Sequence, residues 1–259
     1  MNKLLKNKTI LITKELEGDN SLISLTNAGA NIIYFPTIKI LPFKNNEALD
    51  KALQNFSCYD YLIFTSANAA EIFFEYSKNY NINLANSKIV AVGKKTSNAC
   101  KSLGMKVSLI PNNFSANGII ELFRDENIVK KRILIPCSAI ADKNLKKELN
   151  ELGAKVDAIP IYDVEVNDKS KLTETINFII KQKPDVFIFT SPSTFKAFLT
   201  LMELSNPTVY FNNTLVAAIG PTTETAIKEY KVTVNIIPKK STLEDLEKAI
   251  IEYFLFNEK

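Results

Sequence analysis

An internal duplication is the feature that most constrains how this chain can fold. Three stretches recur in the same order at nearly one offset along the 259 residues. The best preserved pair reads Asp-Tyr-Leu-Ile-Phe-Thr-Ser at residues 60–66 and Asp-Val-Phe-Ile-Phe-Thr-Ser at residues 185–191, an offset of 125. Residues 10–12 recur at 133–135, and residues 91–96 recur at 218–223, with offsets of 123 and 127. Because chance does not preserve both order and spacing, we interpret the chain as a duplicated unit of roughly 125 residues.

Each unit alternates short apolar runs with longer amphipathic stretches, which is typical of buried parallel strands joined by helices. The pattern predicts a doubly wound α/β fold. The expected strands are 9–13, 32–35, 62–65, 89–92, 107–110, 133–135, 156–159, 186–190, 215–219 and 234–237, with helices in the gaps. The last helix is expected to have Ser241 or Thr242 as its N-cap, because Glu244 and Asp245 would then lie at the positive end of the helix dipole.

Two extended segments bounded by proline, 36–42 and 160–166, interrupt this pattern and are interpreted as connectors. A length of 259 residues favours two domains over one. Two connectors indicate a hinge that the chain crosses twice, so that one domain is inserted into the other. No Gly/Ser-rich linker separates the halves, which predicts a short and ordered joint.

Composition excludes several kinds of catalytic site. The chain has no His, so a His base, a Ser-His-Asp triad and nearly all catalytic zinc sites are ruled out. Its only arginines are Arg124 and Arg132, so anions would have to be bound mainly by Lys, hydroxyl groups or backbone N–H groups. Cys58, Cys100 and Cys137 are far apart and form no CxxC motif, so we expect reduced, buried thiols and no metal site.

Charge and hydropathy also limit the partners. The net charge of +4 is spread along the chain, so no nucleic acid is implied. No apolar run approaches the roughly 18 residues of a membrane span. The basic start of the chain is followed by neither a full signal-peptide core nor a small-residue cleavage pattern. We therefore expect a cytoplasmic protein that binds neither nucleic acid nor membrane.

Hydroxyl side chains follow the predicted strands, at the edge where parallel sheets bind ligands. Thr65-Ser66 ends one strand and Thr190-Ser191 ends its repeat, while Thr96 and Thr222-Thr223 follow two glycines. A single Ser or Thr at such a position is usually a helix cap worth about 1 kcal/mol. Four such turns in two matched pairs favour two anion-binding rims that would suit a ligand with several carboxylates.

Charged and aromatic residues near these turns allow two interpretations. Lys14, Lys94 and Lys95 would add positive charge to a binding cleft, or would be ordinary solvated lysines. Tyr162 lies on the second connector, where its phenol could protonate a leaving group, or could be a packed aromatic residue. Lys143, Lys146 and Lys147 have helical spacing and are interpreted as a solvated helix face.

The ordered set of motifs resembles the uroporphyrinogen-III synthase family. The residues that carry the resemblance are the paired Phe-Thr-Ser strand ends, Val92-Gly93-Lys-Lys-Thr96, Gly-Ala-Lys-Val156 leading to Ile161-Tyr162, Thr190-Ser191-Pro192-Ser193 and Ile219-Gly220-Pro221-Thr222-Thr223. The match runs in order over nearly the whole chain. Each motif is weak alone, but the ordered set is fairly specific.

The resemblance implies two flavodoxin-like, doubly wound parallel-sheet domains joined by a two-stranded β-ladder. Domain 1 would be discontinuous, with residues 1–37 and 165–259, and domain 2 would be inserted as residues 41–160. Segments 36–42 and 160–166 would form the ladder.

The resemblance further implies an enzyme of the lyase class in tetrapyrrole (haem, chlorophyll and cobalamin) biosynthesis. Its substrate would be hydroxymethylbilane, an octacarboxylate linear tetrapyrrole, which is cyclised to uroporphyrinogen III with loss of water and inversion of ring D. No cofactor and no metal would take part. We expect a monomer, with possible transient hand-over of the substrate from hydroxymethylbilane synthase. Because the electron-rich pyrroles drive loss of hydroxide, the protein chiefly has to orient the substrate, with Tyr162 as a weak acid.

Site residues follow from the turns together with the resemblance. The candidate catalytic residues are Tyr162, Thr96 and Thr223, and the candidate substrate-binding residues are Thr13, Lys14, Thr65, Ser66, Ala67, Gly93, Lys95, Ser138, Ser191, Pro192, Ser193, Gly220, Pro221 and Thr222. Three positions depart from the family pattern: Lys14-Glu15 replaces Arg-Pro, Asp142 replaces a helix Arg, and Pro136-Cys137-Ser138 replaces an Arg-Gly type of turn.

Two other classes of protein stay open at this level. A non-catalytic two-lobed small-molecule binding protein would also have paired lobes and crossed connectors, although no export signal is evident. A two-domain glycosyltransferase would need a nucleotide site, and the sequence contains no Gly-rich phosphate loop.

Overall fold

The computed structural model describes residues 4–14 and 22–257. The chain forms two compact units. Unit 1 consists of residues 1–39 and 165–259, and unit 2 consists of residues 40–164. The chain therefore passes from one unit to the other twice, after residue 39 and after residue 164.

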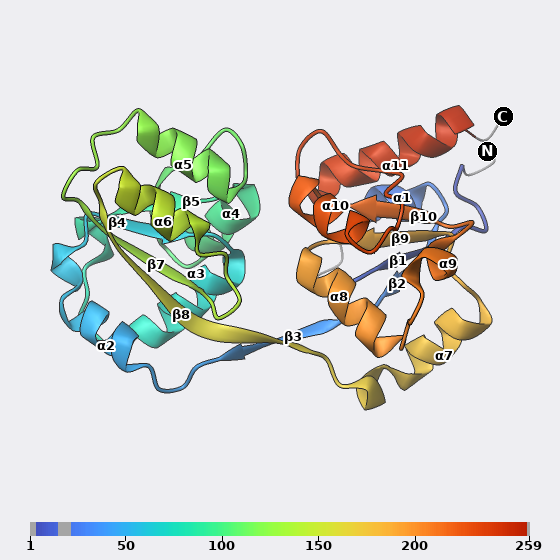
Figure 1. The fold of residues 1–259 in the computed structure, drawn as a ribbon, viewed down its shortest axis with the longest axis horizontal. Helices are drawn as coiled ribbons and strands as arrows, with labels where there is room; N and C mark the ends of the chain where they lie inside the picture. Colours follow the sequence, from blue (N-terminus) through green and yellow to red (C-terminus); the bar gives the residue numbers. More distant parts are fainter. Residues whose placement is uncertain (1–3, 15–21, 258–259) are drawn as a thin grey trace. The chain divides into compact units, whose positions relative to one another are not determined.

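Unit 2 contains most of a six-stranded sheet with the order β3-β8-β7-β4-β5-β6 (Figure 1), whose strands β3 and β8 cross the unit boundary. The strands are β3 (Ile38–Pro42), β4 (Tyr61–Phe64), β5 (Lys88–Ala91), β6 (Val107–Leu109), β7 (Arg132–Ser138) and β8 (Lys155–Val166). The neighbours from β8 to β6 pair in parallel. β3 runs antiparallel to β8, since Phe43 N donates to Ile161 O at 3.0 Å while Asn167 N donates to Thr37 O at 2.9 Å.

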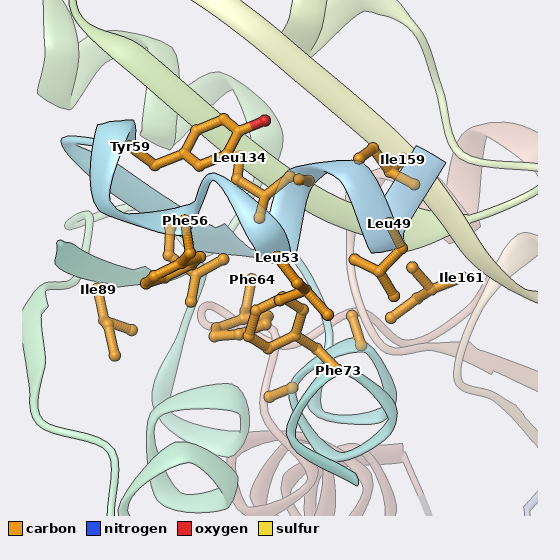
Figure 2. Close-up of a cluster of buried hydrophobic side chains, with 14 of the residues drawn as sticks. Leu49, Leu53, Phe56, Tyr59, Phe64, Phe73, Ile89, Leu134, Ile159 and Ile161 are labelled. Atoms are coloured by element: carbon orange, nitrogen blue, oxygen red, sulfur yellow. The ribbon is translucent and has the colours of Figure 1, made fainter. Parts of the chain in front are cut away.

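Helices cover both faces of this sheet because its strands carry apolar side chains on both sides. One face packs against α2 (Glu47–Gln54), α3 (Ala67–Ser77) and α4 (Lys94–Ser102), and the other packs against α5 (Ala116–Arg124) and α6 (Asn144–Glu151). Figure 2 shows the first of these cores, where Phe64 and Leu134 from the strands meet Leu53 and Phe73 from the helices. The alternation is strict in β4, where Leu62 lies in one core and Ile63 in the other.

Unit 1 has a parallel sheet with the order β10-β9-β1-β2. Its strands are β1 (Thr9–Ile12), β2 (Asn31–Tyr34), β9 (Val186–Phe189) and β10 (Leu215–Ala218). An aromatic core on one face packs against α7 (Thr173–Lys181), α8 (Pro192–Leu201), α9 (Pro207–Phe211) and α10 (Pro221–Lys228). Phe189 and Phe195 meet edge-to-face in this core at 5.0 Å between ring centroids. The opposite face packs against α1 (Ile23–Asn27) and α11 (Leu243–Asn257).

The two sheets repeat one strand order. The series β8-β7-β4-β5 in unit 2 corresponds to β2-β1-β9-β10 in unit 1, and the recurring sequence segments lie on the corresponding strands. In each sheet the chain leaves the two central strands in opposite directions. Central strands β4 and β7, or β9 and β1, therefore flank the topological switch point, where the carboxyl ends of an open α/β sheet bind ligands.

Three expectations from sequence are confirmed, namely the class of the sheets, the cap of the last helix and the place of Pro192. The chain is α/β with parallel sheets. Thr242 caps α11, since its Oγ1 accepts a hydrogen bond from Asp245 N at 3.1 Å. Pro192 lies in the first turn of α8. No helix in the described part of the chain has the length and apolarity needed to cross a membrane.

Two expectations are wrong. Residues 234–237 do not form a strand, and only a single bridge joins Ile236 to Ala217. The ladder does not continue there because the Asn235 side chain accepts the Val216 N–H at 2.9 Å, and because Pro238 has no N–H to donate. Cys58 is exposed, unlike Cys100 and Cys137, because it lies in a short turn after α2 and donates its thiol to Asn55 O.

A buried serine on α4 yields a prediction about stability. Ser97 is 2 % exposed, and its Oγ has no hydrogen-bond partner among the described residues. Ser97→Ala removes a buried polar group and adds a better helix former, so we expect it to raise the free energy of unfolding by about 1 kcal/mol. Urea titration measures the change, with Ser102→Ala on the exposed end of the same helix as control. Loss of stability in Ser97→Ala would contradict the prediction.

Candidate functional site

The switch point of unit 2 brings together three of the predicted site residues. Ser66 follows β4, Ser138 ends β7, and Tyr162 lies beside Ser138 in the register of β8. Ser66 Oγ and Tyr162 OH are 3.1 Å apart, within hydrogen-bonding distance. Ala139 N also donates to Tyr162 O at 2.8 Å, which ties β8 to the turn after β7. A phenol from β8 and two seryl hydroxyls thus meet at the carboxyl ends of β4 and β7.

A β-bulge directs Tyr162 to this position. Pro136 pairs with Ile159 and Cys137 with Pro160, but Ser138 pairs with Tyr162, so Ile161 is one extra residue on β8. Strict alternation would place Tyr162 on the face opposite to Ile161. The side chains of Ile161 and Tyr162 instead lie in the same core, which α3 covers. Ser66 is the N-cap of α3. The bulge therefore re-aims the phenol, as bulges beside functional sites commonly do.

The environment of Tyr162 keeps its hydroxyl protonated. The side chain is 6 % exposed, and this burial is the largest cause of a pKa above the usual tyrosine value. Hydrogen bonds with Ser66 and Ser138 act in the opposite direction, because their hydroxyls stabilise the phenolate. Ser66 Oγ already accepts the Ala69 N–H at 3.0 Å as the N-cap of α3, which leaves its proton available to Tyr162. The cluster can hold a proton for donation and can stabilise the anion that donation leaves.

The start of α4 lies at the end of the neighbouring strand, β5. Gly93 is the N-cap, and a Cβ at Gly93 would lie 2.9 Å from Cγ of Phe114. Lys94 and Lys95 occupy the exposed first turn, whereas Thr96 is 4 % exposed. Within residues 4–14 and 22–257, the Thr96 hydroxyl forms no hydrogen bond. This helix start has backbone N–H groups, positively charged side chains and a hydroxyl, which are the groups that bind anions at helix N-termini.

Unit 1 has the corresponding rim at the end of β9, but its hydroxyl groups bond to one another. Ser191 caps α8 in a capping box with Thr194, and Ser191 Oγ lies 2.9 Å from Ser193 Oγ. Tyr162 has no aromatic counterpart here. Thr37, which follows the equivalent strand β2, instead donates to Thr194 O at 3.1 Å. The duplicated rims therefore share helix starts and hydroxyls, while the buried phenol belongs to unit 2.

The start of α10 repeats the start of α4. Gly220 is the N-cap, Pro221 and Thr222 are exposed in the first turn, and Thr223 is 3 % exposed, like Thr96. A Cβ at Gly220 would clash with Oγ of Ser241, which explains the glycine.

The remaining predicted site residues lie around these turns. Thr13 follows β1, but its hydroxyl donates to Ile188 O at 3.2 Å and so ties β1 to β9. Lys14 is half-buried after Thr13, and Glu15 lies outside the described residues. In unit 2, Thr65 is half-buried and Ala67 is the buried first residue of α3. Asp142 is exposed and accepts the Asn144 N–H at 2.9 Å at the start of α6.

Two contributors were not predicted from the sequence. Phe114 packs on Gly93, and the extra residue Ile161 turns Tyr162 towards Ser66. The Pro160 that opens the bulge was the available signal, since proline in a sheet is confined to edges and bulges. Among the described residues, no group of three or more His, Cys, Asp or Glu side chains is arranged to hold a metal ion.

Comparison with known proteins adds a family to this geometry. The model of the family described as uroporphyrinogen-III synthase HemD matches residues 22–248. A porphyrin biosynthesis protein HemD of Ruminiclostridium josui is 27% identical over 97% of this chain, which spans 50% of that relative. A uroporphyrinogen-III synthase of Synechococcus elongatus is 27% identical, with 95% of each protein covered. Among solved structures, uroporphyrinogen-III synthetase of Helicobacter pylori matches with a TM-score of 0.64 at 21% identity, over 95% of this chain and 99% of that one.

Titration of Tyr162 tests the description of the cluster. Because burial dominates, we expect this phenol to ionise above the ordinary tyrosine pKa of about 10. Ser66→Ala removes a donor to the phenolate, so the pKa of Tyr162 should rise further. NMR of ring-labelled tyrosine, assigned with Tyr162→Phe, follows one signal among the nine tyrosines. A Tyr162 signal that titrates below the ordinary value would show that burial is not the dominant effect.

Proposed function

The chain belongs to the uroporphyrinogen-III synthase family, and on that premise we propose that it cyclises hydroxymethylbilane to uroporphyrinogen III with loss of water and inversion of ring D. The observation that carries the proposal is the Ser66–Tyr162 pair at the switch point of unit 2, 3.1 Å apart. A non-catalytic two-lobed binding protein is not favoured, because it would have no use for a buried proton donor at this point. A monomeric state, a cytoplasmic location and hand-over from hydroxymethylbilane synthase stay predictions.

Tyr162 is proposed to donate the proton for loss of water. The pyrrole electrons expel the hydroxyl group of the substrate, and a proton from the phenol converts that hydroxyl to water. Ser66 and Ser138 then stabilise the phenolate by donating to it. Ring closure leaves one excess proton on the pyrrole carbon that is attacked, and its return to the phenolate restores Tyr162. Protons therefore balance, and the net reaction is loss of one water.

The helix starts are proposed to bind the carboxylates of the substrate. At α4, Lys94 and Lys95 add positive charge to the free N–H groups of the first turn, and Thr96 adds a hydroxyl. At α10, Thr222 and Thr223 add hydroxyls to a first turn without lysine. Holding the chain of four pyrroles in one geometry favours the inverted ring over simple closure, because orientation can supply much of the barrier reduction.

An isomer assay with freshly prepared hydroxymethylbilane tests the reaction and the acid together. The wild-type protein should form the type III isomer, and Tyr162→Phe should lower kcat by about 100-fold, the scale of general acid catalysis. Ser66→Ala should lower kcat by about tenfold, because it removes one hydrogen bond to a developing charge. Ser115→Ala is the matched control, since Ser115 caps α5 in the same way without a recorded contact to Tyr162. Exclusive type I product with the wild-type protein would reject the proposed reaction, and unchanged kcat in Tyr162→Phe would reject the acid.

Isosteric variants test the buried threonines. Thr96→Val and Thr223→Val remove buried hydroxyls that form no hydrogen bond among the described residues, so Tm should not fall. If the hydroxyls bind substrate, KM should rise by about tenfold in each variant, in keeping with the loss of one good hydrogen bond to a carboxylate. Thr200→Val on the exposed side of α8 is the control. An unchanged KM with an unchanged Tm would exclude both threonines from substrate binding.

A further inference from the structure

A hollow of about 330 Å³ lies on unit 2 at the opposite end of the sheet from Tyr162. Tyr59 precedes β4 and Arg132 begins β7, so these two lining residues lie at the amino ends of strands whose carboxyl ends lead to Ser66 and Ser138. The hollow reaches from α2 to α6 around the outer edge of β8, where Ala158 lines it. It is therefore separate from the proposed catalytic cluster.

Arg132 is held in a fixed orientation in this hollow. Its guanidinium carbon lies 4.9 Å from the centroid of the Tyr59 ring, which favours a cation over an aromatic face. Asp157 Oδ2 accepts from Arg132 Nη2 at 3.2 Å and from the Tyr59 hydroxyl at 2.7 Å. Figure 2 shows Tyr59 at the margin of the apolar core that fixes its ring. Of the five N–H donors of a guanidinium, most are left to face a ligand.

The charge of the lining is positive. Lys51 from α2 and Lys146 from α6 join Arg132, against the single carboxylate of Asp157. Asp157 is already engaged by Tyr59 and Arg132. In the described part of the chain, neither Lys51 nor Lys146 forms an ion pair, so both ammonium groups can turn towards an anion.

The edge of β8 contributes a backbone donor. Val156 N donates outward to Asn150 Oδ1 at 3.2 Å, and Pro160 O accepts from Asn46 Nδ2 at 2.7 Å. Since alternate residues of a strand direct their backbone groups to the same side, the N–H of Ala158 faces this edge too. β3 pairs with β8 only beyond the bulge, where Phe43 N meets Ile161 O. The backbone at Ala158 is thus open to the hollow.

We propose that this hollow is a binding site for a small anion with two or more negative charges, carried by phosphate or by carboxylate groups. Arg132 supplies a planar fork of donors, Lys51 and Lys146 supply charge from two sides, and Ala158 N–H adds a directed hydrogen bond. The site does not depend on the proposed reaction, because none of its residues belongs to the catalytic cluster.

Calorimetric titration of the whole chain with pyrophosphate and with citrate tests the site and distinguishes the two sources of charge. We expect at least one of the two anions to bind with one-to-one stoichiometry, more weakly as ionic strength rises. The Lys51→Gln/Lys146→Gln double variant should raise Kd by about tenfold, on the scale of two partly exposed charge contacts. Lys101→Gln, an exposed lysine on α4 of the same unit, should leave Kd unchanged. Arg132→Lys keeps the charge but loses the fork, so it should also weaken binding.

Three outcomes would overturn the site: no binding of either anion at low ionic strength, the same Kd in the double variant as in the wild type, or displacement of the bound anion by hydroxymethylbilane. Thermal shifts alone do not suffice, because phosphate and citrate stabilise folded proteins by exclusion from their surfaces. A shift present in the wild type and absent in the double variant would support specific binding. Because each of these experiments measures binding of an anion, a negative result would reject the anion site without affecting the isomer assay or the proposed reaction.

Discussion

Parallel strands buried on both faces impose the constraint on which each unit depends. Such a sheet needs a helical crossover after nearly every strand, and each crossover helix begins at the carboxyl edge. In unit 2, α3 starts after β4 and α4 starts after β5, so their caps Ser66 and Gly93 lie along one edge. The same rule places Ser191 and Gly220 along one edge of unit 1. Hydroxyls and free N–H groups gather there as a consequence of burying the strands.

Duplication repeats the helix starts along this edge but does not repeat the side chains that contact them. Both units keep a Ser cap after Phe-Thr and a Gly cap three residues before a buried Thr. Only β8 contains the extra residue that turns a tyrosine towards the cap. In unit 1 the corresponding groups both bond to the backbone of Thr194. Ser191 Oγ accepts from Thr194 N, and Thr37 Oγ1 donates to Thr194 O. One extra residue therefore distinguishes a rim of helix starts and hydroxyls from a rim that also contains a buried phenol.

Sequence predicted the elements well where periodicity was strong and failed where local hydrogen bonds compete with the ladder. Strands with apolar side chains on both faces, such as 61–64 and 186–189, were found within one residue of their ends. The run 234–237 is also largely apolar. Its Asn235 side chain, however, accepts the Val216 N–H, which a neighbouring strand would otherwise bind through a backbone carbonyl. The rim residues could be predicted because they follow strands. The contact of Tyr162 with Ser66 and Ser138 could not be predicted, because it depends on a β-bulge. The signal of that bulge in the sequence is a single proline, Pro160.

The two glycine-capped helices also differ in the charge of their first turns, and the charge at the start of α4 disfavours that helix. α10 begins with Pro221 and has Glu224 in its first turn, both of which suit the positive end of a helix. α4 begins with Lys94 and Lys95, each of which costs about 0.3–1 kcal/mol against the helix dipole. A sequence selected for helix stability alone would resemble α10, and the proposed function gives Lys94 a role at the start of α4, namely attraction of a carboxylate. Both lysines belong to the same unit as Tyr162. In the proposed reaction, a polycarboxylate drawn to that helix start would bring its reacting end to the unit that holds the proton donor.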